Sequence, residues 1–382
     1  MSKWRFILCG ALVAAAMATM ATDKTLPAPQ QLAHAAQPWL PGYEPDDWNI
    51  THASAASKLA CQRSEALPIP QGDPPRAGEL PALASCDSQA LYYGDNGKPD
   101  PIRARQCAYL ERGGGNHIGP GGDLAIGGSA VLAMIYANGM GVPRNLPMAT
   151  KFACEAGGAP AEIDGRIEHL QQMAAATSSK RFDFCDDITS GYMGGVCASI
   201  AADQADSRRS DALGEIIRGY STSQRQAYDA LRKAADAYFD AHSGNEVDLS
   251  GSARGAFAIE DKETSEQAFI GNLKALEAGK LPSGDAKQAD ARLNAVYRRV
   301  LANPGLKPQD DGYGSMGTIT AKGIRADQRL WLAYRDAWLH FAAVRKPALP
   351  SDTVLAWLTA QRTDDLRSLL PSKDPDYRSD GN

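Results

Sequence analysis

The chain lacks the short motifs by which most enzymes are found. It has no His-Glu-x-x-His, no Gly-x-Ser-x-Gly, no Gly-x-x-x-x-Gly-Lys-Ser/Thr and no Gly-x-Gly-x-x-Gly after a predicted strand. The absence of Cys-x-x-Cys argues against a zinc ribbon and a thioredoxin-type redox centre. The glycine-rich stretch 113–122 has no lysine to bind phosphate and is typical of a flexible connection. We therefore expect a non-enzymatic protein with no catalytic residues, no cofactor and no metal.

The chain also lacks a long apolar segment and an excess of positive charge. A basic start at Lys3 and Arg5 precedes an apolar run over 6–21, shorter than the roughly 20 residues of a membrane-spanning helix. Small residues up to Ala21 favour cleavage there, so 1–21 is predicted to be a secretory signal peptide. Its removal would lower the net charge of −5 by two, to −7. This acidity disfavours nucleic acid and anionic membranes as partners and suits a basic protein.

A protein with such a signal is expected to be periplasmic or secreted, with no stable membrane insertion afterwards. Cys9 lies inside the apolar run, which argues against a lipid-anchored cysteine. The mature chain keeps an even number of cysteines, which implies disulfides in an oxidising compartment. They are Cys61, Cys86, Cys107, Cys154, Cys185 and Cys197.

Residues 22–80 are rich in proline and are predicted to form an extended arm with a short helix over 53–60. Residues 81–178 then carry two copies of a helix-pair pattern. Aligned positions are Tyr92 with Tyr136, Gly97 with Gly141, Pro99 with Pro143 and Ala104 with Ala149. The Tyr would end one helix, the Gly supply a positive φ in the turn, and the Pro precede the next helix. A closing helix is expected over 161–175.

This pattern resembles the Sel-one-like repeat, a relative of the tetratricopeptide repeat; the segment Gly139-Met-Gly-Val142 carries the likeness best. The resemblance implies a protein-binding surface. Cys61 ends the segment before the first copy and Cys86 begins that copy, so we predict that these two pair. Cys107 and Cys154 lie in successive second helices, and Cys185 and Cys197 are close in sequence, which predicts the other two bridges.

Two helical units are predicted beyond the repeats, over 181–280 and 281–372, with a tail over 373–382. The apolar spacing of Leu213, Ile216, Ile217 and Tyr220 recurs in Leu293, Val296, Tyr297 and Val300. The spacing of Tyr228, Leu231, Ala235 and Tyr238 recurs in Trp331, Tyr334, Trp338 and Phe341. These coincidences suggest a duplication. The predicted fold is all-α: a short repeat solenoid followed by two helical units, held by disulfides.

The four rings of 331–341 lie on one stripe of a helix, which predicts that the stripe is covered. Arg329, Arg335 and Asp336 border it. Such stripes are usually core, with a neighbouring Arg stacked on a ring. The alternative is a partner-binding face made by Arg329, Trp331, Tyr334, Arg335 and Asp336, because Arg and Trp are typical interface anchors.

The order Arg325-x-x-Gln-Arg-x-Trp-x-x-Tyr-Arg-Asp336 resembles the signature helix of the LprI-like lysozyme-inhibitor family of bacterial envelope proteins. Ala289-Asp290, Leu293-Asn294 and Tyr297 extend the likeness. The family's paired cysteines correspond to Cys185 and Cys197, which stand ahead of the first predicted unit. The resemblance implies a non-enzymatic protein that binds and inhibits a lysozyme-type cell-wall hydrolase or a competitor's toxin. The alternative is an adaptor that scaffolds envelope proteins through the repeats.

One loop carries residues that suit either chemistry or capping. His242, Asn245, Glu246, Asp248, Ser250 and Arg254 lie together between two predicted helices. An imidazole and carboxylates at this spacing suit a cation site or acid/base work. Ser250 or Ser252 would equally serve as an N-cap, and Asp248 suits a helix start. We favour capping and expect a chemically inert body; a β-sheet within 185–370, or a deep polar cleft with converging acid and base groups, would contradict it.

Overall fold

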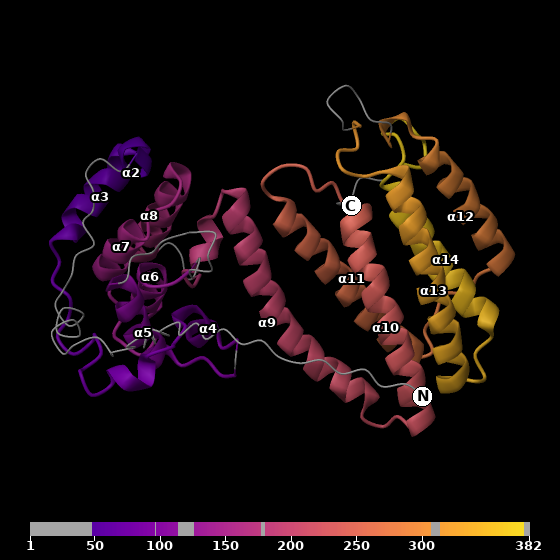
Figure 1. Ribbon diagram of the computed structural model, residues 1–382, viewed down its shortest axis with the longest axis horizontal. Coiled ribbons are helices and arrows are strands. Elements are labelled where there is room, and N and C mark those ends of the chain that lie inside the picture. The colour runs from indigo at the N-terminus through magenta and orange to yellow at the C-terminus, as the bar shows by residue number, and fades with distance from the viewer. Residues whose placement is uncertain (1–47, 96, 114–125, 177–179, 307–313, 378–382) are drawn as a thin grey trace, which may run out of the picture.

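The computed structural model describes residues 48–95, 97–113, 126–176, 180–306 and 314–377, and these residues are all-α as predicted (Figure 1). They contain no strand, only an isolated bridge between Gly314 and Gly317. None of the helices described has both the length and the apolar character that crossing a bilayer requires. The predicted signal peptide 1–21, residues 22–47 of the arm, most of the glycine-rich stretch and residues 378–382 lie outside the described residues.

Seven helices surround the first hydrophobic core, at the indigo-to-magenta end of Figure 1. They are α2 (Trp48–His52), α3 (Ala55–Glu65), α4 (Ser88–Tyr93), α5 (Pro101–Gly113), α6 (Ser129–Asn138), α7 (Leu146–Glu155) and α8 (Pro160–Ala174). The helices α2 and α3 fall within the predicted arm, yet they pack against α7 and α8. From residue 48 onward this segment is therefore part of the first core.

The helices α4 and α5 form one packed pair and α6 and α7 form another, at the positions where the sequence pattern recurs. Gly97 and Gly141 both have a positive φ, of 146° and 69°. The helix ends themselves are capped by other glycines: Gly94 and Gly139 adopt the left-handed conformation that ends α4 and α6. Both turns thus require a residue without a Cβ.

Three disulfides tie this part of the chain together, and two of them differ from the predicted pairs. Cys61 joins Cys154, and Cys86 joins Cys107. The predicted bridges Cys61–Cys86 and Cys107–Cys154 are wrong because α3 packs on α7, across 93 residues of sequence, while α4 and α5 lie side by side. Cys185 joins Cys197 as predicted and fixes the 3-10 turn Phe184–Asp187 to the start of α9 (Gly191–Ile217).

A second core lies at the orange-to-yellow end of Figure 1 and extends from Tyr220 to Leu370. Its helices are α10 (Thr222–Asn245), α11 (Arg254–Glu277), α12 (Ala286–Leu301), α13 (Ala321–Arg345) and α14 (Ser351–Arg367). The long α9 reaches both cores: Met193 and Ile200 belong to the first, and Ile216 and Ile217 pack against the second.

The predicted units 181–280 and 281–372 each supply three helices, and they share this second core. The helix α10 of the first unit packs along α13 of the second, whereas α9 packs along α11 and α12 along α14. The aromatic helix α13 therefore has neighbours from both predicted units. This packing places residues distant in sequence at one buried point.

Candidate functional site

The aromatic stripe of α13 is covered, as the sequence predicts. Trp331, Tyr334, Trp338 and Phe341 are all buried. Tyr334 stacks on Tyr238 of α10 with ring centroids 5.3 Å apart, and Trp338 meets Phe269 of α11 at 5.6 Å. The stripe is thus the centre of the second core.

This burial concerns two residues of the predicted partner-binding set. Trp331 and Tyr334 are buried in the second core and border a cavity there, so partner binding by these two rings stays a prediction. Arg335 lies over the Trp331 ring at 5.4 Å and pairs with Asp336 at 2.9 Å. Arg329 and Asp336 are exposed and Arg335 is half-buried. Partner binding by these three remains a prediction.

A buried ionic cluster lies beside the stripe and is centred on Arg362 of α14. The Arg362 side chain is fully buried and donates from Nη1 and Nη2 to the two oxygens of Glu246, at 2.8 and 2.6 Å. Its Nη2 also lies 3.2 Å from Oδ2 of Asp327, whose side chain is fully buried as well. Its Nε donates to Gln328. One guanidinium thus compensates two buried carboxylates from α13 and the end of α10.

His242 of α10 extends the cluster. Its Nδ1 lies 3.0 Å from Oδ2 of Asp261 and its Nε2 lies 3.6 Å from Oε2 of Glu246. Burial alone would lower the pKa of His242, but the hydrogen bond to Asp261 and the charge of Glu246 raise it to about 9. At neutral pH the imidazole is therefore protonated.

The two carboxylates of the cluster have opposite pKa shifts. Burial and the charge of Glu246 raise the pKa of Asp327 to about 8. Burial opposes ionisation of Glu246 too, but Arg362 lowers its pKa below the usual value. Neither oxygen of Asp327 accepts a hydrogen bond. Glu246 therefore carries the negative charge at neutral pH.

A cavity of about 820 Å³ opens beside this cluster. His242, Glu246 and Arg362 form part of its wall, together with Asp261 and the rings of Trp331 and Tyr334. Acid and base groups therefore reach one wall of this cavity, whose lining is mixed polar and apolar, and the expectation of a chemically inert body stays a prediction. The wall offers an imidazole and a carboxylate to a cation or a polar ligand, while Arg362 already pairs with Glu246 and Asp327.

Of the loop residues singled out in the sequence, His242 and Glu246 enter the cluster and the others do not. Asp248 accepts hydrogen bonds from the backbone N–H groups of Ser250 at 2.9 Å and Thr318 at 3.1 Å, which ties two loops together. The predicted N-cap role of Ser250 or Ser252 is wrong, because α11 begins after Ala253 without a side-chain cap.

Asp327 and Arg362 were not predicted as site residues from the sequence. Asp327 precedes Trp331 by four residues and so lies on the aromatic stripe of α13. Arg362 stands four residues from both Leu358 and Leu366, on the buried face of α14. A charged residue in register with an apolar stripe is the sequence signal that could have identified both.

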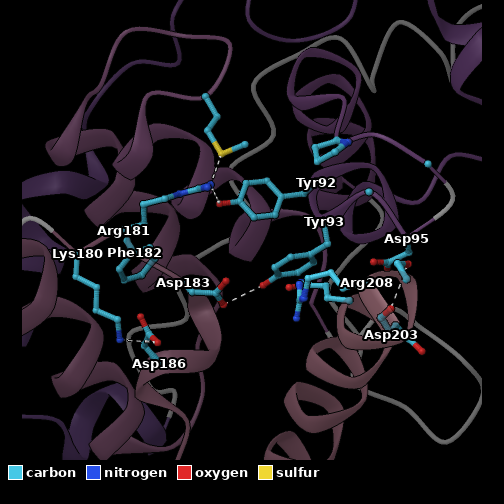
Figure 2. Close-up of a pocket in the computed structure, with 16 residues that line it drawn as sticks. Tyr92, Tyr93, Asp95, Lys180, Arg181, Phe182, Asp183, Asp186, Asp203 and Arg208 are labelled. Atoms are coloured by element: carbon cyan, nitrogen blue, oxygen red, sulfur yellow. Dashed lines mark hydrogen bonds and ion pairs between the residues drawn. The ribbon is translucent and has the colours of Figure 1, made fainter. Parts of the chain in front are cut away.

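A second cavity, of about 560 Å³, lies where α4 and the segment around Arg181 face α9 (Figure 2). Tyr93 donates to Asp183 at 2.9 Å, and Arg181 donates to the Tyr92 hydroxyl at 3.4 Å. Figure 2 shows both tyrosines directed toward this segment, with Asp203 and Arg208 on the opposite wall. Charges of both signs line the cavity, which no sequence pattern predicted.

A smaller groove of about 320 Å³ lies between α12 and α13. Asp290, Asn294 and Tyr297 line it from α12. From α13 come Arg325, Gln328, Arg329 and Leu332. Leu332 is 37 % exposed, unusual for a leucine in this chain. The groove combines an exposed apolar side chain with cations and one carboxylate.

Comparison with models of known protein families gives a match in the C-terminal part of the chain. The family model described as "Lysozyme inhibitor LprI" matches residues 276–366, which include α12, α13 and all but the last residue of α14. No curated protein and no solved structure matches the chain. The match includes neither 81–178 nor 181–275, so the Sel-one-like repeats and the duplication stay predictions. Residues 276–366 are therefore similar to lysozyme inhibitors of the LprI family.

Proposed function

We propose that this is an exported envelope protein that binds and inhibits a lysozyme-type cell-wall hydrolase, or a toxin of that kind from a competitor. The observation that carries the proposal is the match of residues 276–366 to the LprI lysozyme-inhibitor model. Three disulfides and the predicted signal peptide support an extracytoplasmic location. An inhibitor needs a preorganised surface and no catalytic group of its own.

The groove between α12 and α13 is the surface we assign to the target. It lies wholly within the matched segment and contains Arg329, one of the predicted partner-binding residues. Arg325 and Arg329 provide two cations, Asp290 a carboxylate, and Leu332 an exposed apolar side chain. Arginine beside an exposed apolar side chain is a common composition of interface anchors.

A turbidity assay of lysozyme-treated cell walls tests the proposal. Purified mature protein is expected to slow clearing in proportion to its concentration. Arg329→Glu should weaken this protection at least about tenfold, which corresponds to roughly 1.4 kcal/mol of binding free energy. Arg218→Glu is the matched control, because its side chain is 72 % exposed at the far end of α9. Absence of protection at every stoichiometry, across a panel of cell-wall hydrolases, would refute the inhibitor function.

The α4–α5 and α6–α7 pairs favour a second candidate, an adaptor that holds other envelope proteins. Helix pairs stacked in this way often present a continuous protein-binding face. Affinity capture from an envelope extract separates the two functions. If the protein captures a structural envelope protein and inhibits no hydrolase, the adaptor function is supported. If it captures a hydrolase or a toxin, the inhibitor function is supported.

A further inference from the structure

His242, Glu246 and Asp327 bring three potential metal donors together at one point of the second core. One ring nitrogen and one oxygen from each carboxylate all lie within 4.8 Å of one another. We propose that these residues bind a divalent transition-metal ion of the Zn²⁺ type. The site goes beyond the proposed inhibition of a hydrolase and does not depend on it.

The donor atoms lie somewhat farther apart than they would in a formed coordination shell. Zn–N and Zn–O bonds of about 2 Å place tetrahedral donors roughly 3.3 Å apart. Side-chain movements of about 1 Å would close the present spacing of up to 4.8 Å. One imidazole with two carboxylates matches the preferences of Zn²⁺ and neighbouring transition metals, whereas Ca²⁺ and Mg²⁺ prefer oxygen alone.

Asp261 holds the His242 ring as an outer residue of a metal site does. Its Oδ2 lies 3.0 Å from Nδ1, which leaves Nε2 directed toward Glu246 at 3.6 Å. A carboxylate on the second nitrogen is the usual arrangement for a metal-binding histidine, because it fixes the ring orientation and increases the basicity of the donor. Asp261 is thus a positioning residue in this proposal.

Asp327 is the observation that most requires a ligand. Its side chain is fully buried, and neither carboxylate oxygen accepts a hydrogen bond. Among the described residues, the cation in close contact with Asp327 is Arg362. Its Nη2 lies 3.2 Å from Oδ2 of Asp327 and also donates a hydrogen bond to Glu246. Asp327 has only the Glu246 carboxylate and the shared Arg362 guanidinium beside it, and a metal ion in place of the proton held between the two acids would stabilise its ionised form.

Arg362 is compatible with the ion rather than a substitute for it. Binding would displace the protons of His242 and Asp327, and the divalent ion with the Arg362 guanidinium would then balance the negative charges of Glu246, Asp327 and Asp261. Arg362 would keep its two hydrogen bonds to Glu246 and orient that ligand. The cavity of about 820 Å³, walled in part by His242 and Glu246, gives the ion a path and room for a water ligand.

The test is binding of ZnCl2 to untagged mature protein that has been stripped with a chelator. Calorimetry should show one Zn²⁺ per chain, and Zn²⁺ should raise the melting temperature. His242→Gln and Asp327→Asn should each weaken binding at least tenfold. Glu260→Gln is the control, because Glu260 lines the same cavity without belonging to the donor set and should bind as the parent does.

Circular dichroism first confirms that each variant is folded. If Asp327→Asn does not fold, the test uses the Zn²⁺ affinity of His242→Gln and the absorption bands of the parent protein loaded with Co²⁺. No Zn²⁺ binding by the parent, or equal binding by His242→Gln, would overturn the site and leave the cluster a purely ionic network. If the parent protein binds Zn²⁺ but inhibits no hydrolase, the proposed function is refuted and the metal site is not.

Discussion

Arg362 of α14 and Glu246 at the end of α10 form a buried two-bond ion pair, with distances of 2.6 and 2.8 Å. Arg362 lies inside the segment that matches the lysozyme-inhibitor model, and Glu246 lies 30 residues before its start at residue 276. The pair therefore joins the matched segment to a helix that the match does not include.

Arg362→Met should strongly destabilise the protein. It would leave Glu246 and Asp327 buried without their guanidinium, and breaking a buried ion pair costs about 3–5 kcal/mol. Urea unfolding in the presence of a chelator measures the loss. Arg218→Met is the control, because the Arg218–Glu215 pair is largely exposed and should matter little. If Arg362→Met lowers the free energy of unfolding as little as the control does, the Arg362–Glu246 pair does not stabilise the fold.

Residues 276–366 should not fold as an isolated fragment. Removing α10 and α11 would expose the aromatic stripe of α13 and leave Arg362 without Glu246. A fragment covering 185–377, with all six helices and the Cys185–Cys197 bridge, should fold. Circular dichroism and the cooperativity of thermal unfolding distinguish the two. A cooperative transition in the shorter fragment would show that the matched segment is independent.

The disulfides should differ in their contribution to stability. Cys61–Cys154 closes a sequence separation of 93 residues and Cys185–Cys197 one of 12. In the chain-entropy model these loops correspond to about 4.5 and about 3 kcal/mol. Replacing Cys61 and Cys154 with Ser should therefore lower the unfolding free energy more than replacing Cys185 and Cys197. The reverse order in calorimetry would indicate that native packing, not loop length, sets the difference. Non-reducing peptide mapping checks the pairing.

Glu162 should make the protein sensitive to acid. Burial would raise the pKa of its carboxyl, but hydrogen bonds from the backbone N–H groups of Thr189, Ser190 and Ala159 lower it below the usual 4.5. A lowered folded-state pKa contributes stability above pH 4.5, and this contribution is lost as the pH falls through the folded-state value.

Glu162→Gln should therefore be less stable than the parent at pH 7, and the difference should shrink below pH 4.5. Urea unfolding across this pH range measures it. Glu168→Gln, on the exposed face of the same helix, is the control and should follow the parent throughout. A Glu162→Gln deficit that does not change with pH would mean that the lost hydrogen bonds, not the charge, set the cost.

The sequence predicted most of what local periodicity determines. The spacing of Trp331, Tyr334, Trp338 and Phe341 predicted a buried helical stripe, and Gly97 and Gly141 have the positive φ expected of them. Helix pairing over long separations was not predictable in the same way. Two predicted disulfides are wrong because α3 packs on α7, and no local sequence pattern indicates that contact.

The candidate site was only half predicted for the same reason. His242 and Glu246 are neighbours in sequence and were recognised together, whereas Asp327 and Arg362 meet them only through the packing of α10, α13 and α14. Each is a charged residue on an otherwise apolar helical face. Such residues can be marked from sequence, but which opposite charge they meet depends on the three-dimensional fold.

The helix α9 has a mechanical consequence. Its 27 residues, at 1.5 Å of rise each, make a rod about 40 Å long. One end of this rod contributes side chains to the first core and the other packs against the second. A partner bound to the first core would thus be kept at a fixed distance and angle from a partner bound to the second, because a continuous helix and not a flexible linker connects the two cores.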